Sequence, residues 1–591
     1  MMGHPSERRD FSVNLRSLGI AAAAALIGLL STFAAYCLLG LIHLFTNLFF
    51  FGSFSFGGRS PAFNHLGLWV IPIPIVGGLI VGAMARFGSE KIRGHGIPEA
   101  IEAILFGKSK MSLKVALLKP LSSGIAIGSG GPFGAEGPII MTGGAIGSLL
   151  GQHLRISGAE RKALLVAGAV AGMTAVFGTP IAAVMLAVEL LLFELRPRSL
   201  LPVAVACAVA GFSRSLILDA GPLFPLRTSV VTPICLFSCL LAGVACGALS
   251  WALSTSLYKV EDVFGKLPIH WMWWPAMGAV AVGVGGYLQP RALGVGYDVI
   301  GDLLGNHLVA QAALTLLLCK ALMWVVALGS GTSGGVLAPL LMLGAGLGVV
   351  LGPYLPGGEP SLWPLVFMAA TLGGMMRAPI MAVMFAFEVT QDANALLPLL
   401  AACATAYGFT VLTMPRSILT EKIARRGYHI YREYGIDPLE RHTVQEVMSR
   451  ELQTIDARTS IVDAVERHFG SAQKHRAFPV VREGVYLGML DRAGLLKAQS
   501  NSGMELISDL FGVNSPVIAL PDETCRIVAT RMAIHELERL PVVKDAQSRL
   551  LLGLIARSDL IKPSLGLFDE EDNYEQFQRS PFAGMLALFR R

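Results

Sequence analysis

The strongest constraint on the fold of this 591-residue chain is an internal duplication within a long apolar region. Residues 125–151 align without a gap to 326–352, with 11 identities in 27 positions, and residues 179–189 align to 378–388, with 7 in 11. Two matches in the same order, at offsets of 201 and 199, indicate tandem halves of roughly 200 residues. The expected repeats cover about 90–215 and 290–415.

The duplicated region has the composition of a membrane domain. The whole chain is 53% hydrophobic, with a mean hydropathy of +0.60, which is too apolar for a soluble protein of this size. Gly and Pro interrupt its apolar stretches, as in 128–138 and 329–339, and broken backbone is tolerated at membrane depth only where it is buried or lines a cavity. Residues 421–591 hold 47 charges in 171 positions, against 41 in the 420 positions before them. We therefore predict an α-helical polytopic membrane domain at 1–420 and a soluble domain after it.

Charge and cysteine usage exclude other classes of protein. The net charge of +6 lies almost wholly in the membrane part, and no basic tract with interleaved aromatic residues predicts a nucleic-acid partner. The eight cysteines are scattered, so neither a disulfide framework nor a metal or other cofactor is expected. No nucleophile with a base is evident, and we do not expect an enzyme. Arg8, Arg9 and Arg16 precede an uncleaved first helix and predict a cytoplasmic N-terminus.

Two similar units follow a charged connector at 421–441. Each reads strand, helix, strand, strand, helix, with FPVV and LPVV at matching places, an order that resembles an α/β tandem CBS pair at 442–498 and 507–564. Nucleotide-binding CBS copies usually have Ser or Thr three residues before an Asp, and here Asp559 is kept while Ala556 replaces the hydroxyl. Adenine-nucleotide contact through Asp559 is therefore open, and a dimer-stabilising or expression-related module is the favoured reading. A tail at 565–591 ends the chain.

Three Gly-rich turns that open into apolar helices form the candidate anion site. Glycines let backbone N–H groups converge on a ligand, and the free donors at a helix N-terminus carry partial positive charge. Such donors favour an anion, while close helix packing through small residues is the alternative for any single turn. The candidate anion-binding residues are Gly94, His95, Gly96, Ile97, Pro98, Gly134, Ala135, Gly137, Pro138, Gly335, Val336, Leu337, Ala338 and Pro339.

Glu136 is the one ionisable residue inside the two duplicated turns. A carboxylate at the mouth of an anion site competes with the anion when charged and releases the site when protonated, so Glu136 is the candidate gate and proton acceptor. Its repeat partner is Leu337, which means that the duplicated fold does not require a carboxylate there. The alternative is a helix-start glutamate that stabilises the helix dipole.

The ordered motifs GHGIPE (94–99), GAEGP (134–138) and GVLAP (335–339), with the duplication and the CBS pair, resemble the CLC family of chloride channels and chloride/proton antiporters. The resemblance covers almost the whole chain. It implies inverted halves, a homodimer with one pore in each subunit, and an anion held by helix-start amides. It also implies that Glu136 is the external gating glutamate.

Four departures from the family pattern bear on mechanism. His95 stands where the family usually has serine, Leu337 replaces the usual phenylalanine, and Leu419 falls where a tyrosine commonly closes the inner end of the anion path. Backbone amides would then carry the anion, and His95 either adds pH sensitivity or is merely tolerated. Leu190 replaces the internal proton-relay glutamate of many antiporters. Neighbouring Glu189, with its repeat partner Glu388, is interpreted as a structural carboxylate at a helix end.

These features predict a chloride/proton antiporter gated by Glu136, homodimeric, multi-pass, in a bacterial inner membrane, with cytoplasmic CBS domains. Its expected partners are chloride or another small anion, protons and membrane lipids. Two alternatives remain open: a passive voltage- or pH-gated chloride channel that uses the same pathway, and a non-transporting anion sensor that signals through the CBS domains.

Overall fold

The computed structural model describes two compact units, Met1–Arg432 and Glu433–Arg591. Its described residues are 16–218, 221–428, 430, 439, 442–469, 477–499, 505–511 and 516–564. Arg8, Arg9, the tail at 565–591 and most of the connector at 421–441 lie outside them.

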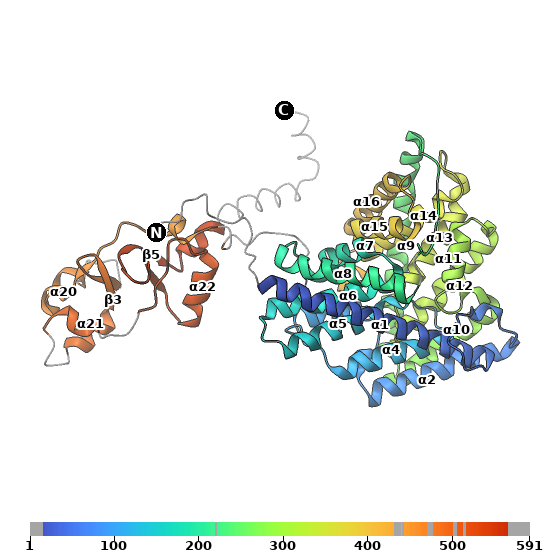
Figure 1. Ribbon diagram of the computed structural model, residues 1–591, viewed down its shortest axis with the longest axis horizontal. Coiled ribbons are helices and arrows are strands. Elements are labelled where there is room, and N and C mark those ends of the chain that lie inside the picture. The colour runs from blue at the N-terminus through green and yellow to red at the C-terminus, as the bar shows by residue number, and fades with distance from the viewer. Residues whose placement is uncertain are drawn as a thin grey trace. The chain divides into compact units, whose positions relative to one another are not determined.

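The first half of the membrane unit is a layer of closely packed helices in which α1, α6 and α8 lie side by side (Figure 1). Glycine allows the close crossings: a Cβ on Gly143 or Gly168 would lie 2.1 Å from the other residue's carbonyl oxygen, where α5 meets α6. The helices are α1 (Arg16–Phe51), α2 (Pro72–Phe87), α3 (Ile97–Leu105), α4 (Leu113–Gly128), α5 (Glu136–His153), α6 (Gly158–Phe177), α7 (Pro180–Leu186), the π-helix η5 (Ala187–Leu192) and α8 (Pro197–Ile217), with 3-10 segments η2 (Pro61–Phe63), η3 (Gly67–Val70) and η4 (Glu90–Ile92).

The second half repeats the helix order of the first, and the helix boundaries follow the duplication seen in the sequence. α5 and α13 begin at the aligned positions 136 and 337, and α7 and α15 begin at Pro180 and Pro379. The helices are α9 (Pro233–Gly265), α10 (Trp274–Leu288), α11 (Tyr297–Leu304), α12 (Ala310–Gly329), α13 (Leu337–Leu351), α14 (Leu362–Met376), α15 (Pro379–Thr390), α16 (Leu396–Thr413) and α17 (Ile418–Arg425), with 3-10 segments η6 (Trp271–Trp273), η7 (Pro290–Ala292) and η8 (Gly352–Tyr354). Among the described residues, seven helical segments are long and apolar enough to cross a membrane.

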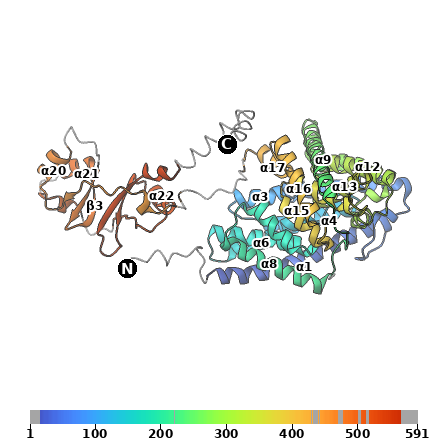
Figure 2. The ribbon, with the colours of Figure 1, turned by 90° about the horizontal axis from the view of Figure 1, so that it is seen from above.

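The helix α17 changes the expected start of the connector. Residues 421–425 were expected to link the domains, but they form the last turns of α17, which packs against α3 (Figure 2). Apolar and charged side chains both hold this placement. Ile418, Leu419 and Ile423 are fully buried, while Arg425 pairs with Asp262 of α9 at 2.5 Å and Lys422 pairs with Glu99 of α3 at 3.0 Å. A charged segment is therefore part of the membrane unit.

The second unit contains the two expected α/β copies. In the first copy β1 pairs in parallel with β2, and β2 pairs antiparallel with β3; in the second copy β4 pairs antiparallel with β5. Alternate residues of β5 are buried, while Val480 of β2 and Val542 of β4 are fully buried in separate apolar cores. The elements are α19 (Val444–Val447), β1 (Ile455–Asp456), α20 (Ile461–His468), β2 (Ala477–Arg482), β3 (Val485–Asp491), α21 (Arg492–Gln499), η9 (Ile507–Leu510), α22 (Cys525–Ile534), β4 (Arg539–Val543), β5 (Leu551–Ala556) and η10 (Asp559–Ser564).

Candidate anion pathway

The two duplicated turns pair with each other and are buried inside the membrane unit. Gly134 N donates to Gly335 O at 3.2 Å, and Gly335 N donates to Gly134 O at 2.9 Å, an antiparallel pair between positions equivalent in the two repeats. Antiparallel pairing places equivalent residues opposite each other, as a local two-fold axis requires. Segments about 200 residues apart are thus joined where α5 and α13 begin.

The third turn joins the same cluster, and its contacts obey the same symmetry. Gly94 N donates to Gly331 O at 3.3 Å, and the repeat-related pair, Gly294 N to Gly130 O, measures 3.0 Å. The turn before α3 and its counterpart before α11 therefore dock on opposite halves. The three turns expected to form one site are neighbours.

The pairing changes which amides are available to an anion. The N–H groups of Gly94, Gly134 and Gly335 are bonded to other turns, and Gly96 N donates to Glu99 Oε2 at 3.1 Å. These four glycine amides are therefore not available to bind an anion. Donors in the first turn of a helix have no intrahelical acceptor. In α5 and α13 they are the N–H groups of Glu136, Gly137, Leu337 and Ala338.

The Glu136 side chain folds back over the paired turns. A Cβ added to Gly134 would lie 1.8 Å from Glu136 Oε2, and one added to Gly335 would lie 2.6 Å from the same oxygen. Glu136 is fully buried, and within the described residues Oε2 has no hydrogen-bond partner. The carboxylate interacts electrostatically with the backbone N–H groups of Glu136 itself and of Ala338. A carboxyl group thus stands at the start of both helices.

Tyr297 supplies a side-chain hydrogen bond to this carboxylate that the sequence did not suggest. Its hydroxyl donates to Glu136 Oε1 at 3.4 Å from the first residue of α11, in the other half. The ring packs edge-on against Phe177, with centroids 6.0 Å apart, and lies 6.4 Å from Phe224. The motif GVGY, aligned with GHGI of the first half, is the signal that could have marked it.

Two fully buried lysines, which the sequence did not mark as functional, donate hydrogen bonds to the turns before α3 and α11. Lys119 Nζ donates to the carbonyl oxygens of Ile92 and Gly94 at 2.8 and 2.7 Å, and to Ser333 Oγ at 3.0 Å. Lys320 makes the two equivalent carbonyl bonds in the second half, at 2.9 and 2.8 Å. An offset of 201 residues between two lysines in apolar helices was the available signal.

Glu189 and Glu388 are structural, as interpreted from the sequence, but each caps a helix of the opposite half. The Glu388 carboxylate accepts bonds from the N–H groups of Ile181 and Ala182, at the start of α7, at 3.0 and 2.8 Å. Glu189 makes the equivalent pair of bonds at the start of α15, at 3.3 and 2.9 Å. The two caps are therefore reciprocal: each half supplies the carboxylate that caps a helix of the other half.

The side chains at the inner end of the expected pathway are apolar. Leu190 lies in the π-helix η5 and is fully buried, as is Leu419 in the first turn of α17.

His95 of the third turn is also buried, and among the described residues its Nδ1 has no hydrogen-bond partner. Its ring lies in the field of Lys422, Glu99, Lys119 and Arg426.

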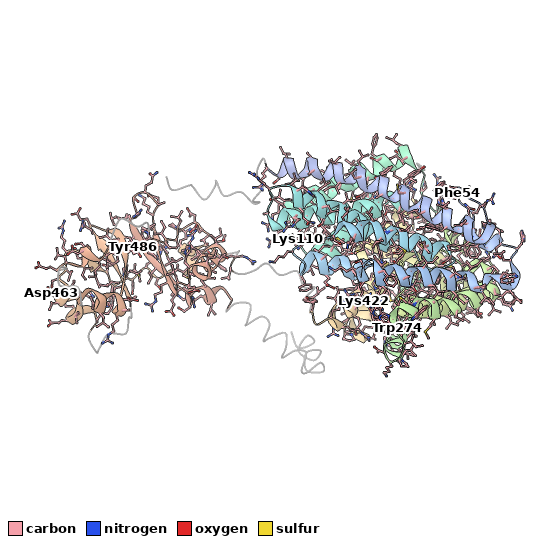
Figure 3. The ribbon with its side chains drawn as sticks, turned by 90° about the horizontal axis from the view of Figure 1, so that it is seen from below. Phe54, Lys110, Trp274, Lys422, Asp463 and Tyr486 are labelled. Carbon is pink, nitrogen blue, oxygen red and sulfur yellow. The ribbon has the colours of Figure 1, made fainter. Side chains whose placement is uncertain are left out.

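A charged cavity of about 470 Å³, here called the vestibule, is lined by Gly94 of the third turn and by Lys422 and Arg425 of α17. Figure 3 labels Lys110 and Lys422, which border it, and Trp274, on which Arg93 of its wall stacks at 5.7 Å. Six basic and four acidic side chains face it, so its wall favours an anion. They are Lys91, Arg93, Lys110, Lys422, Arg425, Arg426, Glu90, Glu99, Glu102 and Glu261.

In the second unit the Asp559 carboxylate already has partners. Oδ2 accepts the N–H of Ala556 at 2.8 Å, and Oδ1 pairs with Lys562 Nζ at 2.6 Å. The carboxylate therefore caps its own turn at the start of η10.

Comparison with known proteins agrees with this architecture. The family model described as voltage gated chloride channel matches residues 76–411, and the CBS domain model matches 444–501 and 507–566. The chain belongs to the voltage-gated chloride channel family. Within that family, the voltage-gated ClC-type chloride channel ClcB of Citrobacter koseri is 30% identical over 349 residues, which cover 56% of this chain and 82% of the relative.

Two solved structures share the fold of this family member. A slow cyanobacterial Cl⁻/H⁺ antiporter superposes with a TM-score of 0.62 at 21% identity, over 70% of this chain and 99% of the other. A eukaryotic CLC transporter covers 92% of this chain and 98% of its own, with a TM-score of 0.58 at 18% identity. The fold is therefore the CLC fold followed by a CBS pair, as expected from the sequence.

Proposed function

We propose that this protein exchanges chloride, or a similar small anion, for protons across a membrane, with the Glu136 carboxylate as both gate and proton acceptor. The position of that carboxylate is the observation that carries the proposal: it is buried over Gly134 and Gly335, beside the amides at the start of α5 and α13. A charged carboxylate there occupies the place of an anion, and the protonated form loses most of its attraction to the amide donors.

The family and its structural neighbours support the same reading. A slow cyanobacterial Cl⁻/H⁺ antiporter shares the fold, and a second neighbour is a CLC-type fluoride/proton antiporter. Exchange needs one group that alternates between proton and anion occupancy, and Glu136 is the buried carboxylate at the paired turns. The basic excess of the vestibule supplies anions to the site from one side.

The test is flux in proteoliposomes that contain a pH reporter. An imposed chloride gradient should drive protons uphill in the wild-type protein, whereas Glu136→Ala should keep chloride flux and lose proton movement. Leu337→Ala is the matched control for truncation at the repeat-related position: it removes no ionisable group, so the chloride flux that remains in this variant should still be coupled to protons. Proton pumping by Glu136→Ala would remove Glu136 from the mechanism.

A passive chloride channel is the second candidate, and the inner end of the pathway favours it. Leu190 and Leu419 are apolar and fully buried, so neither offers a proton relay or a hydroxyl gate. In the flux experiment a channel would carry chloride down its gradient without moving protons against theirs. A third outcome, no flux of any small anion, would instead favour an anion sensor acting through the CBS domains.

The same proposal includes the assembly and its place in the cell. We expect a homodimer with a pathway in each subunit, in a bacterial inner membrane, with the CBS pair on the cytoplasmic side. Because Asp559 is engaged by Ala556 and Lys562, a stabilising role for the CBS pair is favoured over adenine-nucleotide binding. Calorimetry with ATP and AMP on the intact protein tests this, since micromolar binding would reverse the preference.

A further inference from the structure

The Glu136 carboxylate is held by a residue from the opposite half of the membrane unit. Tyr297 is the first residue of α11, and its hydroxyl donates to Glu136 Oε1 at 3.4 Å. The other oxygen, Oε2, lies over Gly134 and Gly335. One oxygen is therefore bound by a tyrosine while the other faces the paired turns.

The repeat shows that this pair is an addition to the duplicated fold. Aligning Gly94 and Gly96 with Gly294 and Gly296 makes Ile97 the counterpart of Tyr297, just as Leu337 is the counterpart of Glu136. Both counterparts are apolar and fully buried, so the fold forms the same turns without either polar group. One of the two symmetry-related places therefore has both the carboxylate and its hydroxyl donor, and the other has neither.

The surroundings hold the tyrosine ring in place. The ring lies edge-on to Phe177 at 6.0 Å, and Phe177 in turn contacts Phe385 of α15 at 5.0 Å. Gly296, with φ of +79°, begins the turn that directs the chain into α11. A hydroxyl on a ring packed in this way donates at little cost in side-chain entropy, because the ring is already fixed.

Tyr297 is also the polar side chain that contacts the gate. Helices α1, α3, α4, α6 and α13 pack against α5, and in the described residues they bring no charged side chain into contact with the Glu136 carboxylate. Its other polar neighbours are backbone N–H groups. Lys119, Lys422 and Arg426 act instead on Glu99 and His95, at the vestibule side of the third turn.

We propose that Tyr297 is a positioning residue for the gate: its hydroxyl holds the charged Glu136 carboxylate over the paired turns and so sets the proton concentration at which the pathway opens. This inference rests on the proposed role of Glu136. A donor to the charged carboxylate stabilises that form, so removal of the hydroxyl makes protonation, and with it opening, easier. Transport should then persist to higher pH.

Tyr297→Phe tests the proposal, because it removes one oxygen atom and keeps the ring. The midpoint of chloride flux against pH in proteoliposomes should move upward by about 1–2 units, as expected for one hydrogen bond to a charged group. Tyr287→Phe, which alters an exposed tyrosine of α10, is the matched control and should leave the midpoint in place. An unchanged midpoint in Tyr297→Phe overturns the proposal.

Two further variants separate positioning from packing and from the gate itself. Tyr297→Ile copies the counterpart Ile97, and it should shift the midpoint as Tyr297→Phe does if the hydroxyl matters; a shift in the isoleucine variant alone would make the role one of ring packing. In the Glu136→Gln background, Tyr297→Phe should add no shift, because there is no charged carboxylate to hold. A shift of the same size there would refute the inference, whereas coupling retained by Glu136→Ala would refute the proposed function instead.

Discussion

Alanine at position 134 should force the gate open without protonation. The added Cβ would lie 1.8 Å from Glu136 Oε2 and 2.4 Å from Cδ, whereas Cβ contacts below 3.0 Å essentially never occur. The carboxylate must therefore retreat by at least 1.2 Å, the difference between 3.0 and 1.8 Å. Gly134 is not among the residues with positive φ, so the alanine itself adds no backbone strain.

The size of the effect follows from the interactions that the displaced carboxylate can no longer make. A retreat of that size breaks the hydrogen bond from Tyr297, which measures 3.4 Å in the wild-type protein, and withdraws the charge from the paired turns. A hydrogen bond to a charged group contributes about 1.5–3 kcal/mol, which corresponds to a change of about 10- to 150-fold in the ratio of closed to open gates. Folding should be spared, because the clashing atoms belong to the end of a flexible side chain.

The assay is chloride efflux from proteoliposomes at pH 8, where the wild-type carboxylate should be charged and the gate closed. Gly134→Ala should raise efflux and weaken proton coupling. Gly137→Ala is the matched control: its Cβ would lie 1.8 Å from the backbone oxygen of His95, so it should reduce folded yield rather than open the gate. Wild-type efflux with full coupling in Gly134→Ala, or equal stimulation by Gly137→Ala, would refute the steric reasoning.

Two predictions concern the joints between the halves. Glu388→Gln and Glu189→Gln should each lower the free energy of unfolding by about 1–2 kcal/mol, because each removes a charged cap from a helix of the other half. Denaturant titrations in detergent measure this, and a loss smaller than their error would contradict the capping role. Lys320→Met should lower the free energy of unfolding by about 2–5 kcal/mol, because it leaves two buried carbonyl oxygens without a donor. Lys119→Met should lower it further, because Ser333 also loses a hydrogen-bond partner. If the two lysine variants were as stable as the wild-type protein, the hydrogen bonds from these lysines to the turns would not stabilise the fold.

Patterns along the chain were sufficient to predict the architecture. The offset of about 200 residues and the Gly and Pro interruptions are local or periodic signals, and both had their counterparts in the helix boundaries. The return of charge after residue 420 indicated a second unit, which begins at Glu433. Glu136 was identifiable because it is the one ionisable residue inside two duplicated turns. The start of the connector was misplaced, since a charged helix that pairs with Glu99 reads in sequence like a linker.

Tertiary structure decided which groups act together at the site. The bond between Tyr297 and Glu136 spans 161 residues, and the bond between Glu388 and Ala182 spans 206, so neither leaves a periodic trace. The same holds for the amides: the N–H groups of Gly94, Gly134 and Gly335 are used in pairing the turns, and that of Gly96 bonds Glu99. The residues that follow these glycines therefore supply the proposed anion donors. By itself the sequence determined a duplicated membrane fold with one carboxylate at its turns, because apolar spacing and backbone freedom are properties of single segments. The docking of the halves decided what holds that carboxylate, because a hydrogen bond depends on where two distant segments meet.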